Sequence, residues 1–314
     1  MPEFTTRPRP SGSDTPEGSC TLTHPKVYVA TVHWNSDDWV AIQIRNLRKH
    51  IPMKMEIFAF VDGVSERLIE GFDRKFFNES APHYEKLDML ASEISRVARD
   101  EDIILFIDGD AFPINNLRPV FDNLEHYPLV AVRRDENFGD KQPHPCFCMT
   151  TVGLWRQLAG TWKPGVQWMR DDGNMGSDVG GNLYGALQDA KIDWKPLLRS
   201  NSEELHPLFF GVYANSIYHH GAGFRDKLCR RDARRGIDAY SAFCIRLLNR
   251  WAGRPALKHP RKWLRKHVNS YMRHKNGRLH KRVLASLQDD DSFIFDQHLA
   301  TREVQEDSRG KQQG

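Results

Sequence analysis

Three short apolar runs, each followed by a polar cluster, constrain the fold of this chain most strongly. The runs occupy residues 26–32, 55–61 and 102–107. Such runs are typical of strands buried on both faces of a sheet. The segments between them carry apolar residues at helical spacing. The alternation predicts an α/β fold, with a mostly parallel central sheet and helices on both of its faces.

The rest of the chain continues this pattern less regularly. Helices are expected at 39–50, 65–78, 84–99, 119–124, 153–159 and 177–190, and further strands at 129–133, 146–152 and 215–220. The segment 163–176 is rich in Gly, Pro and Asp, which predicts a loop.

Polar clusters follow all three of the first strands. They are Thr31–Ser36, Asp62-Gly63 and Asp108–Asp110. The carboxyl ends of parallel strands lie at one edge of a sheet, where ligands bind in such folds. We therefore expect the three clusters to converge on one site.

The third cluster has the chemistry of a metal site. Asp108 and Asp110 are separated by one glycine and come directly after a buried strand, so both carboxylates can face one ion. Hard oxygen ligands favour Mg²⁺ or Mn²⁺, which keep open positions for substrate phosphates. Gly109 would let the backbone approach such a phosphate closely.

This motif resembles that of metal-dependent glycosyltransferases of the GT-A fold, in the glycogenin-like and bacterial lipopolysaccharide groups. The similar stretch is Leu105-Phe-Ile-Asp-Gly-Asp-Ala-Phe-Pro113, and the resemblance covers about residues 26–227. It implies that Lys86, in Tyr84-Glu-Lys86, contacts the donor. It also implies that His220, in His220-Gly-Ala-Gly-Phe-Arg225, is a third metal ligand. Asp226 stands where those relatives have a lysine.

The resemblance also implies a nucleotide-sugar donor, with UDP-sugar favoured, and a hydroxyl of a glycan or lipid-linked acceptor. The residues expected to contact the donor are Ala30, Thr31, His33, Asp62 and Lys86, together with Asp108 and Gly109 beside the metal.

Asp178 is the candidate catalytic residue. It lies near the start of the helix expected at 177–190, where a helix dipole stabilises a carboxylate. In an inverting enzyme it would be the general base for the acceptor hydroxyl, and in a retaining enzyme it would bind the donor sugar. Asp171 and Asp172 are alternatives. Three tryptophans that could stack on an acceptor sugar are Trp155, Trp162 and Trp168.

The charge is unevenly distributed along the chain. Residues 239–288 contain 13 Lys or Arg and no Asp or Glu, whereas the remainder has a net charge of about −9. The block contains helix-like stretches at 240–251 and 260–272. It could pack on the acidic body, bind an anionic membrane surface or, as a weaker interpretation, bind nucleic acid.

The predicted organisation is a disordered leader at 1–24, a catalytic domain at 25–238, the basic segment at 239–288 and a flexible tail at 289–314.

Composition narrows the cellular context. No apolar run approaches the roughly 20 residues of a membrane helix, and residues 1–19 lack the apolar core of a signal peptide. These features predict a cytoplasmic protein, with peripheral attachment to the inner membrane face as an option.

The five cysteines are irregularly spaced, so we expect reduced thiols, with Cys146 and Cys148 on one face of a strand.

One other enzyme class also places Asp-x-Asp after an apolar strand, namely phosphotransferases of the haloacid-dehalogenase type. In that class the motif usually ends the first strand, and Thr or Val stands four residues after the first Asp. Here two strands precede the motif, and Phe112 stands at that position. The sequence therefore favours the glycosyltransferase interpretation.

Overall fold

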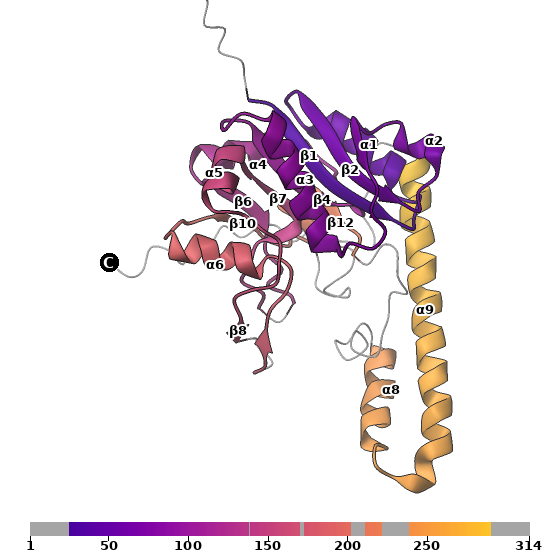
Figure 1. Ribbon diagram of the computed structural model, residues 1–314. Coiled ribbons are helices and arrows are strands. Elements are labelled where there is room, and N and C mark those ends of the chain that lie inside the picture. The colour runs from indigo at the N-terminus through magenta and orange to yellow at the C-terminus, as the bar shows by residue number, and fades with distance from the viewer. Residues whose placement is uncertain (1–24, 138, 170–172, 202–210, 222–238, 290–314) are drawn as a thin grey trace, which may run out of the picture.

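The computed structural model describes residues 25–137, 139–169, 173–201, 211–221 and 239–289 of the chain. A seven-stranded sheet, in the order β10-β6-β7-β4-β1-β2-β3, forms its centre (Figure 1). The strands are β1 Val27–Trp34, β2 Met55–Asp62, β3 Arg74–Phe76, β4 Ile103–Asp108, β6 Leu129–Val132, β7 His144–Thr151 and β10 Lys195–Leu197. Only β7 runs against its neighbours, so six strands end at the same edge.

Helices cover both faces of this sheet. One core holds apolar residues of α1 (Val40–His50), α2 (Glu66–Ile69) and α4 (Arg118–Phe121), the last continuing into a 3-10 turn at Asp122–Glu125. The other holds those of α3 (His83–Val97), α5 (Val152–Gln157) and α6 (Gly181–Asp189). Alternate residues of each strand serve the two cores, as Val29 and Ala30 do. The predicted fold class, a mostly parallel α/β sheet with helices on both faces, is confirmed.

A second, smaller sheet forms beside the carboxyl edge of the first. Its strands are β5 Ala111–Pro113, β12 Ile217–His219 and β11 Gly211–Tyr213, in the order β11-β12-β5. Because β5 begins just after Asp110 and β12 pairs with it antiparallel, Ala111 lies opposite His219. This pairing brings a late segment of the chain to the Asp-Gly-Asp turn.

The helix predicted at 65–78 is wrong. Only the four residues of α2 are helical, and the chain then runs as β3 along β2. Asp73 anchors this change, because its backbone N–H donates to the Ile57 carbonyl at 3.0 Å and its carboxylate accepts from the Ile57 N–H at 2.8 Å. Pairing at the sheet edge therefore overrides the helical spacing.

Several short strands were not predicted. The supposed loop at 163–176 contains a small hairpin of β8 (Trp168–Met169) and β9 (Met175–Gly176). Strands of two or three residues, such as β5, β10 and β11, are too short to show the alternation of apolar and polar residues by which a strand is predicted.

An irregularity in β7 corrects the prediction for its two cysteines. The pairing of β7 with β6 shifts between Ala131 and Val132, which is the signature of a bulge. Cys148 packs in the core under α3, whereas Cys146 packs in the opposite core. The two thiols therefore point to different faces, and the bulge turns Cys146 toward the Asp-Gly-Asp edge. Both cysteines are free and buried.

The basic block forms a helical hairpin that projects from the body (Figure 1). It consists of α8 (Ala239–Arg250), a 3-10 turn at Pro255–Leu257 and α9 (Lys258–Asp289). A narrow buried seam joins its helices, formed by Cys244, Leu248, Leu264 and Val268. None of the helices in the described ranges is both long and apolar enough to span a bilayer. The boundary expected at 238, the leader and most of the tail fall outside the described residues.

The Asp-Gly-Asp turn depends on the glycine for space. A Cβ at Gly109 would lie 2.3 Å from the Val32 carbonyl oxygen, whereas a Cβ at Gly71 would meet only the end of the Ile44 side chain, at 2.8 Å. We expect Gly109→Ala to lower the free energy of unfolding by about 1–3 kcal/mol, because the backbone of β1 cannot yield easily. Urea unfolding checks this, with Gly71→Ala as the control. Equal losses in the two variants would contradict it.

Candidate metal centre

Two carboxylates and one imidazole converge at the carboxyl edge of the central sheet. Ligand atoms of Asp108, Asp110 and His219 all lie within 4.8 Å of one another. His219 Nε2 is 3.4 Å from Asp110 Oδ1 and 3.6 Å from Asp108 Oδ2. All three side chains are at most 15% exposed. Among the described residues, this is the group of three with metal-ligating geometry.

The fold explains why these residues meet. Asp108 ends β4, and Asp110 follows after the glycine. The antiparallel pairing of β12 with β5 sets His219 beside them, and the His220 backbone N–H donates to the Asp110 carbonyl at 2.9 Å. The third member is therefore fixed by backbone hydrogen bonds to the turn itself.

A buried glutamine on α1 holds the turn from behind. Gln43 Nε2 donates to the carbonyls of Asp108 and Ala111, both at 2.7 Å. Its Oε1 accepts from Thr31 Oγ1 at 3.0 Å and lies 2.9 Å from His33 Nε2. Burial lowers the pKa of His33 from 6.5 to about 4, so His33 is neutral and donates from Nε2. Thr31 and His33 thus reach the site through Gln43, which sequence reasoning missed.

The structure brings His219, and not His220, to the carboxylates. Successive strand residues face opposite ways, and His220 turns toward an aromatic cluster. Its ring lies 4.4 Å from that of Trp39, and its Nδ1 is 2.8 Å from the Tyr218 hydroxyl. The sequence hypothesis used the correct alternation but chose the other face. The segment 222–227, which includes Asp226, lies outside the described residues.

The donor set fits a divalent cation. Asp108 Oδ1 is buried, and its contact with His83 Nε2, at 3.3 Å, lacks the geometry of a hydrogen bond. A buried carboxylate oxygen needs a donor or a cation. Two such carboxylates would also repel each other without positive charge between them. Two oxygen ligands and one imidazole suit Mn²⁺ or Mg²⁺ with room for further oxygen ligands.

The imidazole of His83 also faces the carboxylates, a position that sequence reasoning did not identify. His83 begins α3, and its Nε2 lies 3.3 Å from Asp108 Oδ1. Burial opposes a charge on this ring, but the contact with Asp108 and the field of Asp110 raise its pKa. A partly exposed cation would therefore border the site next to Asp108 Oδ1.

Two neighbouring side chains keep the proton on His219. Burial alone lowers its pKa, but Cys146 and Asp110 together raise it well above 6.5. His144, 6.1 Å away between ring centroids, has its pKa lowered by burial and by Arg134. His144 is therefore neutral. Without a metal, His219 carries the proton that a bound cation would displace.

The predicted donor-contacting residues differ in their placement. Lys86 and Asp62 are buried and bind each other, with Lys86 Nζ 2.5 Å from Asp62 Oδ2. Asp62 Oδ1 also accepts from the Asn78 N–H at 2.8 Å. Ala30 lies within a core because β1 continues to Trp34, two residues past its predicted end. Trp34, at the end of β1, stays 40% exposed.

Asp178 lies on a loop before α6, and not in its first turn. Its Oδ1 accepts from the Val179 N–H at 2.9 Å, and its Oδ2 is 3.2 Å from Arg134 Nη2. Arg134 in turn acts on His144, which neighbours His219. Asp178 is thus linked to the carboxylate cluster through charged and imidazole side chains, and its own side chain is 42% exposed.

Neither the two alternatives to Asp178 nor the three tryptophans are seen to contribute to the site. Asp171 and Asp172 lie outside the described residues. The tryptophans are buried, at 5% exposed for Trp155, 0% for Trp162 and 6% for Trp168. They belong to the interior and do not offer faces to a sugar.

Comparison with known proteins gives limited similarity. No family model matches the chain, and no curated protein matches it. Solved structures that match include S. aureus TarS, at 14% identity over 44% of this chain and 30% of TarS, with a TM-score of 0.34. The mannosyltransferase PcManGT from Pyrobaculum calidifontis, in complex with GDP-Man and Mn²⁺, matches at 13% identity over 56% of this chain and 55% of PcManGT, with a TM-score of 0.39.

The galactosyltransferase LgtC matches at 12% identity over 51% of this chain and 70% of LgtC, with a TM-score of 0.31. The aligned region thus spans about a third of TarS and about half of PcManGT.

The different orientations of His219 and His220 predict different effects of substituting them on Mn²⁺ binding. We expect His219→Ala to weaken Mn²⁺ binding by about tenfold or more, because a ligand is lost, and His220→Ala to change it much less. The free Mn²⁺ signal in electron paramagnetic resonance titrations measures both, after circular dichroism has shown that each variant is folded. A larger loss in His220→Ala would place the ligand on the other face of β12.

Proposed function

We propose that this protein is a glycosyltransferase that uses a divalent metal to hold a nucleoside-diphosphate sugar and transfers the sugar to a hydroxyl group. One observation carries the proposal. Asp108, Asp110 and His219 converge at the carboxyl edge of a mostly parallel sheet, with ligand atoms within 4.8 Å of one another. That edge is where open α/β sheets bind nucleotides.

Each residue of the centre has a distinct task in this proposal. Asp108, Asp110 and His219 would hold Mn²⁺ or Mg²⁺, which supplies Lewis acidity toward a departing diphosphate. Gln43 keeps both carbonyls of the turn fixed, so the carboxylates are preorganised. His83, whose pKa is raised, would donate to a phosphate oxygen. Trp34 offers an exposed ring for the nucleobase.

Asp178 is proposed to act on the sugar side of the site. Its contact with Arg134 orients the carboxylate, and its partial exposure leaves one side open to substrate. In an inverting reaction it accepts the proton of the acceptor hydroxyl, and in a retaining reaction it binds the transferred sugar. Lys86 and Asp62 satisfy each other's charge, so their proposed role is to fix α3 against the end of β2.

The donor and acceptor are proposed by class. UDP-sugar is favoured as the donor by the resemblance of the metal motif, and the acceptor is a hydroxyl of a glycan or a lipid-linked glycan. The hairpin of α8 and α9 carries unbalanced positive charge and exposes Phe243 and Trp263, which supports an anionic membrane surface as its partner. The nucleic-acid alternative stays a weaker prediction.

The activity is tested by metal-dependent nucleotide binding and donor hydrolysis. We expect UDP to bind with Mn²⁺ and to bind at least tenfold more weakly with EDTA, because the diphosphate needs the cation. A screen of nucleotide sugars with Mn²⁺ should then show slow hydrolysis of one donor, which Asp110→Asn abolishes. If the affinity for UDP is the same in Mn²⁺ as in EDTA, and the affinity for GDP likewise, the proposal is refuted.

The role of Asp178 is tested by a substitution that removes only its charge. We expect Asp178→Asn to lower turnover by about 100-fold or more, while Mn²⁺-dependent UDP affinity stays within twofold, because the residue does not touch the metal cluster. Asp189→Asn, at the exposed end of α6, is the matched control and should retain full activity. A variant that loses UDP binding and turnover together would show that Asp178 serves the donor site.

A further inference from the structure

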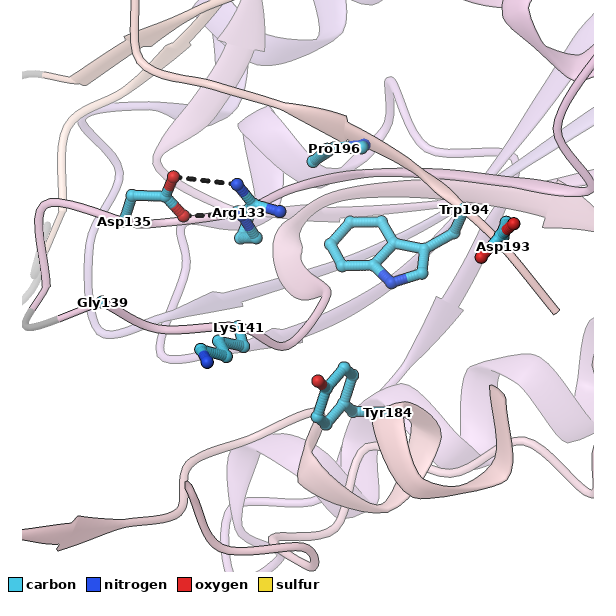
Figure 2. Close-up of a pocket in the computed structure, with 8 residues that line it drawn as sticks. All are labelled: Arg133, Asp135, Gly139, Lys141, Tyr184, Asp193, Trp194 and Pro196. Carbon is cyan, nitrogen blue, oxygen red and sulfur yellow. Dashed lines mark hydrogen bonds and ion pairs between the residues drawn. The ribbon is translucent and has the colours of Figure 1, made fainter. Parts of the chain in front are cut away.

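A separate cavity of about 500 Å³ lies near the edge strand of the central sheet, between β10 and α6 (Figure 2). Its lining residues come from the loop after β6, from α6, and from β10 and the chain that enters it. The volume falls in the range of small-ligand sites. None of its lining residues belongs to the Asp108, Asp110 and His219 cluster.

Two aromatic rings border the cavity from different elements. Trp194 precedes β10 and Tyr184 lies on α6, and both rings border the same space (Figure 2). Both residues are only half-buried. An aromatic pair of this kind offers large rigid apolar faces with polar tips. Such faces suit a ligand that has both apolar C–H surfaces and hydroxyl groups.

The charged groups of the cavity cancel. Arg133 makes a two-pronged contact with Asp135, at 2.6 and 2.9 Å, and Lys141 and Asp193 complete the charged lining (Figure 2). Two cations and two anions give no net charge to attract a phosphate. They do provide several donors and acceptors at the wall of one cavity, which is what the hydroxyls of a sugar ring require.

The cavity is coupled to the metal centre by one loop. Residues 133 and 141 line the cavity, whereas Arg134 and Asp140 turn inward, 3.5 Å apart, and Arg134 reaches Asp178 at 3.2 Å. Since β6 runs parallel to β4, this loop leaves the sheet at the same edge as Asp108. A chain of sugars could therefore extend from the cavity toward Asp178.

We propose that this cavity binds an uncharged sugar ring of a glycan acceptor, with Trp194 and Tyr184 on the apolar faces of the ring and Lys141 and the Arg133–Asp135 pair on its hydroxyls. The acceptor role of this sugar rests on the proposed function, whereas the binding of a neutral sugar rests on the cavity alone. The site thereby narrows the acceptor class from any hydroxyl to a glycan.

Saturation-transfer NMR on the full chain tests the proposal without nucleotide. The probes are the methyl glycosides of glucose, galactose, mannose and N-acetylglucosamine, with the corresponding β-linked disaccharides. We expect at least one of them to bind, and Tyr184→Ala and Trp194→Leu each to weaken that binding by about tenfold. Phe77→Leu, at a 66% exposed position just after β3, is the matched control and should leave it unchanged.

Because Trp194 also packs against a core, Lys141→Ala provides a variant at an exposed position that keeps the fold. It should weaken binding by several-fold. No binding of any probe, or binding that none of the three cavity variants weakens, would overturn the proposal. Sugar binding that the variants weaken, in a protein that never binds UDP or GDP with Mn²⁺, would support the cavity and refute the transferase function.

Discussion

One buried amide group determines the geometry on which the candidate site depends. Gln43 uses both of its N–H donors on the carbonyls of Asp108 and Ala111, and its oxygen faces Thr31 and His33. A buried amide is costly unless all of its polar atoms are paired, and here every partner belongs to the same turn or to the adjacent strand. The glutamine therefore locks α1, β1 and the Asp-Gly-Asp turn into one arrangement.

The locked turn explains how distant parts of the chain become part of the same site. Once Ala111 is fixed, β5 can pair with β12, and that pairing delivers His219 from more than 100 residues away. The bulge in β7 acts in the same direction, because it turns Cys146 toward His219. A parallel sheet leaves its carboxyl edge open. The small sheet covers part of that edge and brings the candidate metal ligand His219 to it.

The ionisable side chains form a sequence that begins at this edge. Near the two carboxylates stand His219 and His83, both with raised pKa values, followed by neutral His144 and then by Arg134 and Asp178. Farther out, the cavity between β10 and α6 carries balanced charge and aromatic rings. This order, from a cation-attracting centre to a neutral aromatic cavity, would suit the proposed substrates, a nucleoside-diphosphate sugar at the centre and a glycan in the cavity.

The central strands were predictable because their signal is local. The runs at 26–32, 55–61 and 102–107 are apolar, and their polar ends marked the edge where ligands collect. The pair of Asp108 and Asp110 followed from the same reasoning, since both positions depend only on the strand that precedes them. The helix expected at 65–78 failed because hydrogen bonds to Ile57, which is distant in sequence, outweighed local periodicity.

What the sequence by itself determined is the α/β class, the position of the two carboxylates and the charge division between body and hairpin. Tertiary structure alone decided that His219 and not His220 faces the carboxylates, because strand alternation allows either face until β12 pairs with β5. It alone decided that Lys86 and Asp62 neutralise each other, and that Gln43 supports the turn. The Lys86–Asp62 and Gln43–Asp108 contacts join residues 24 and 65 positions apart, and such pairings are set by packing, which no local pattern encodes.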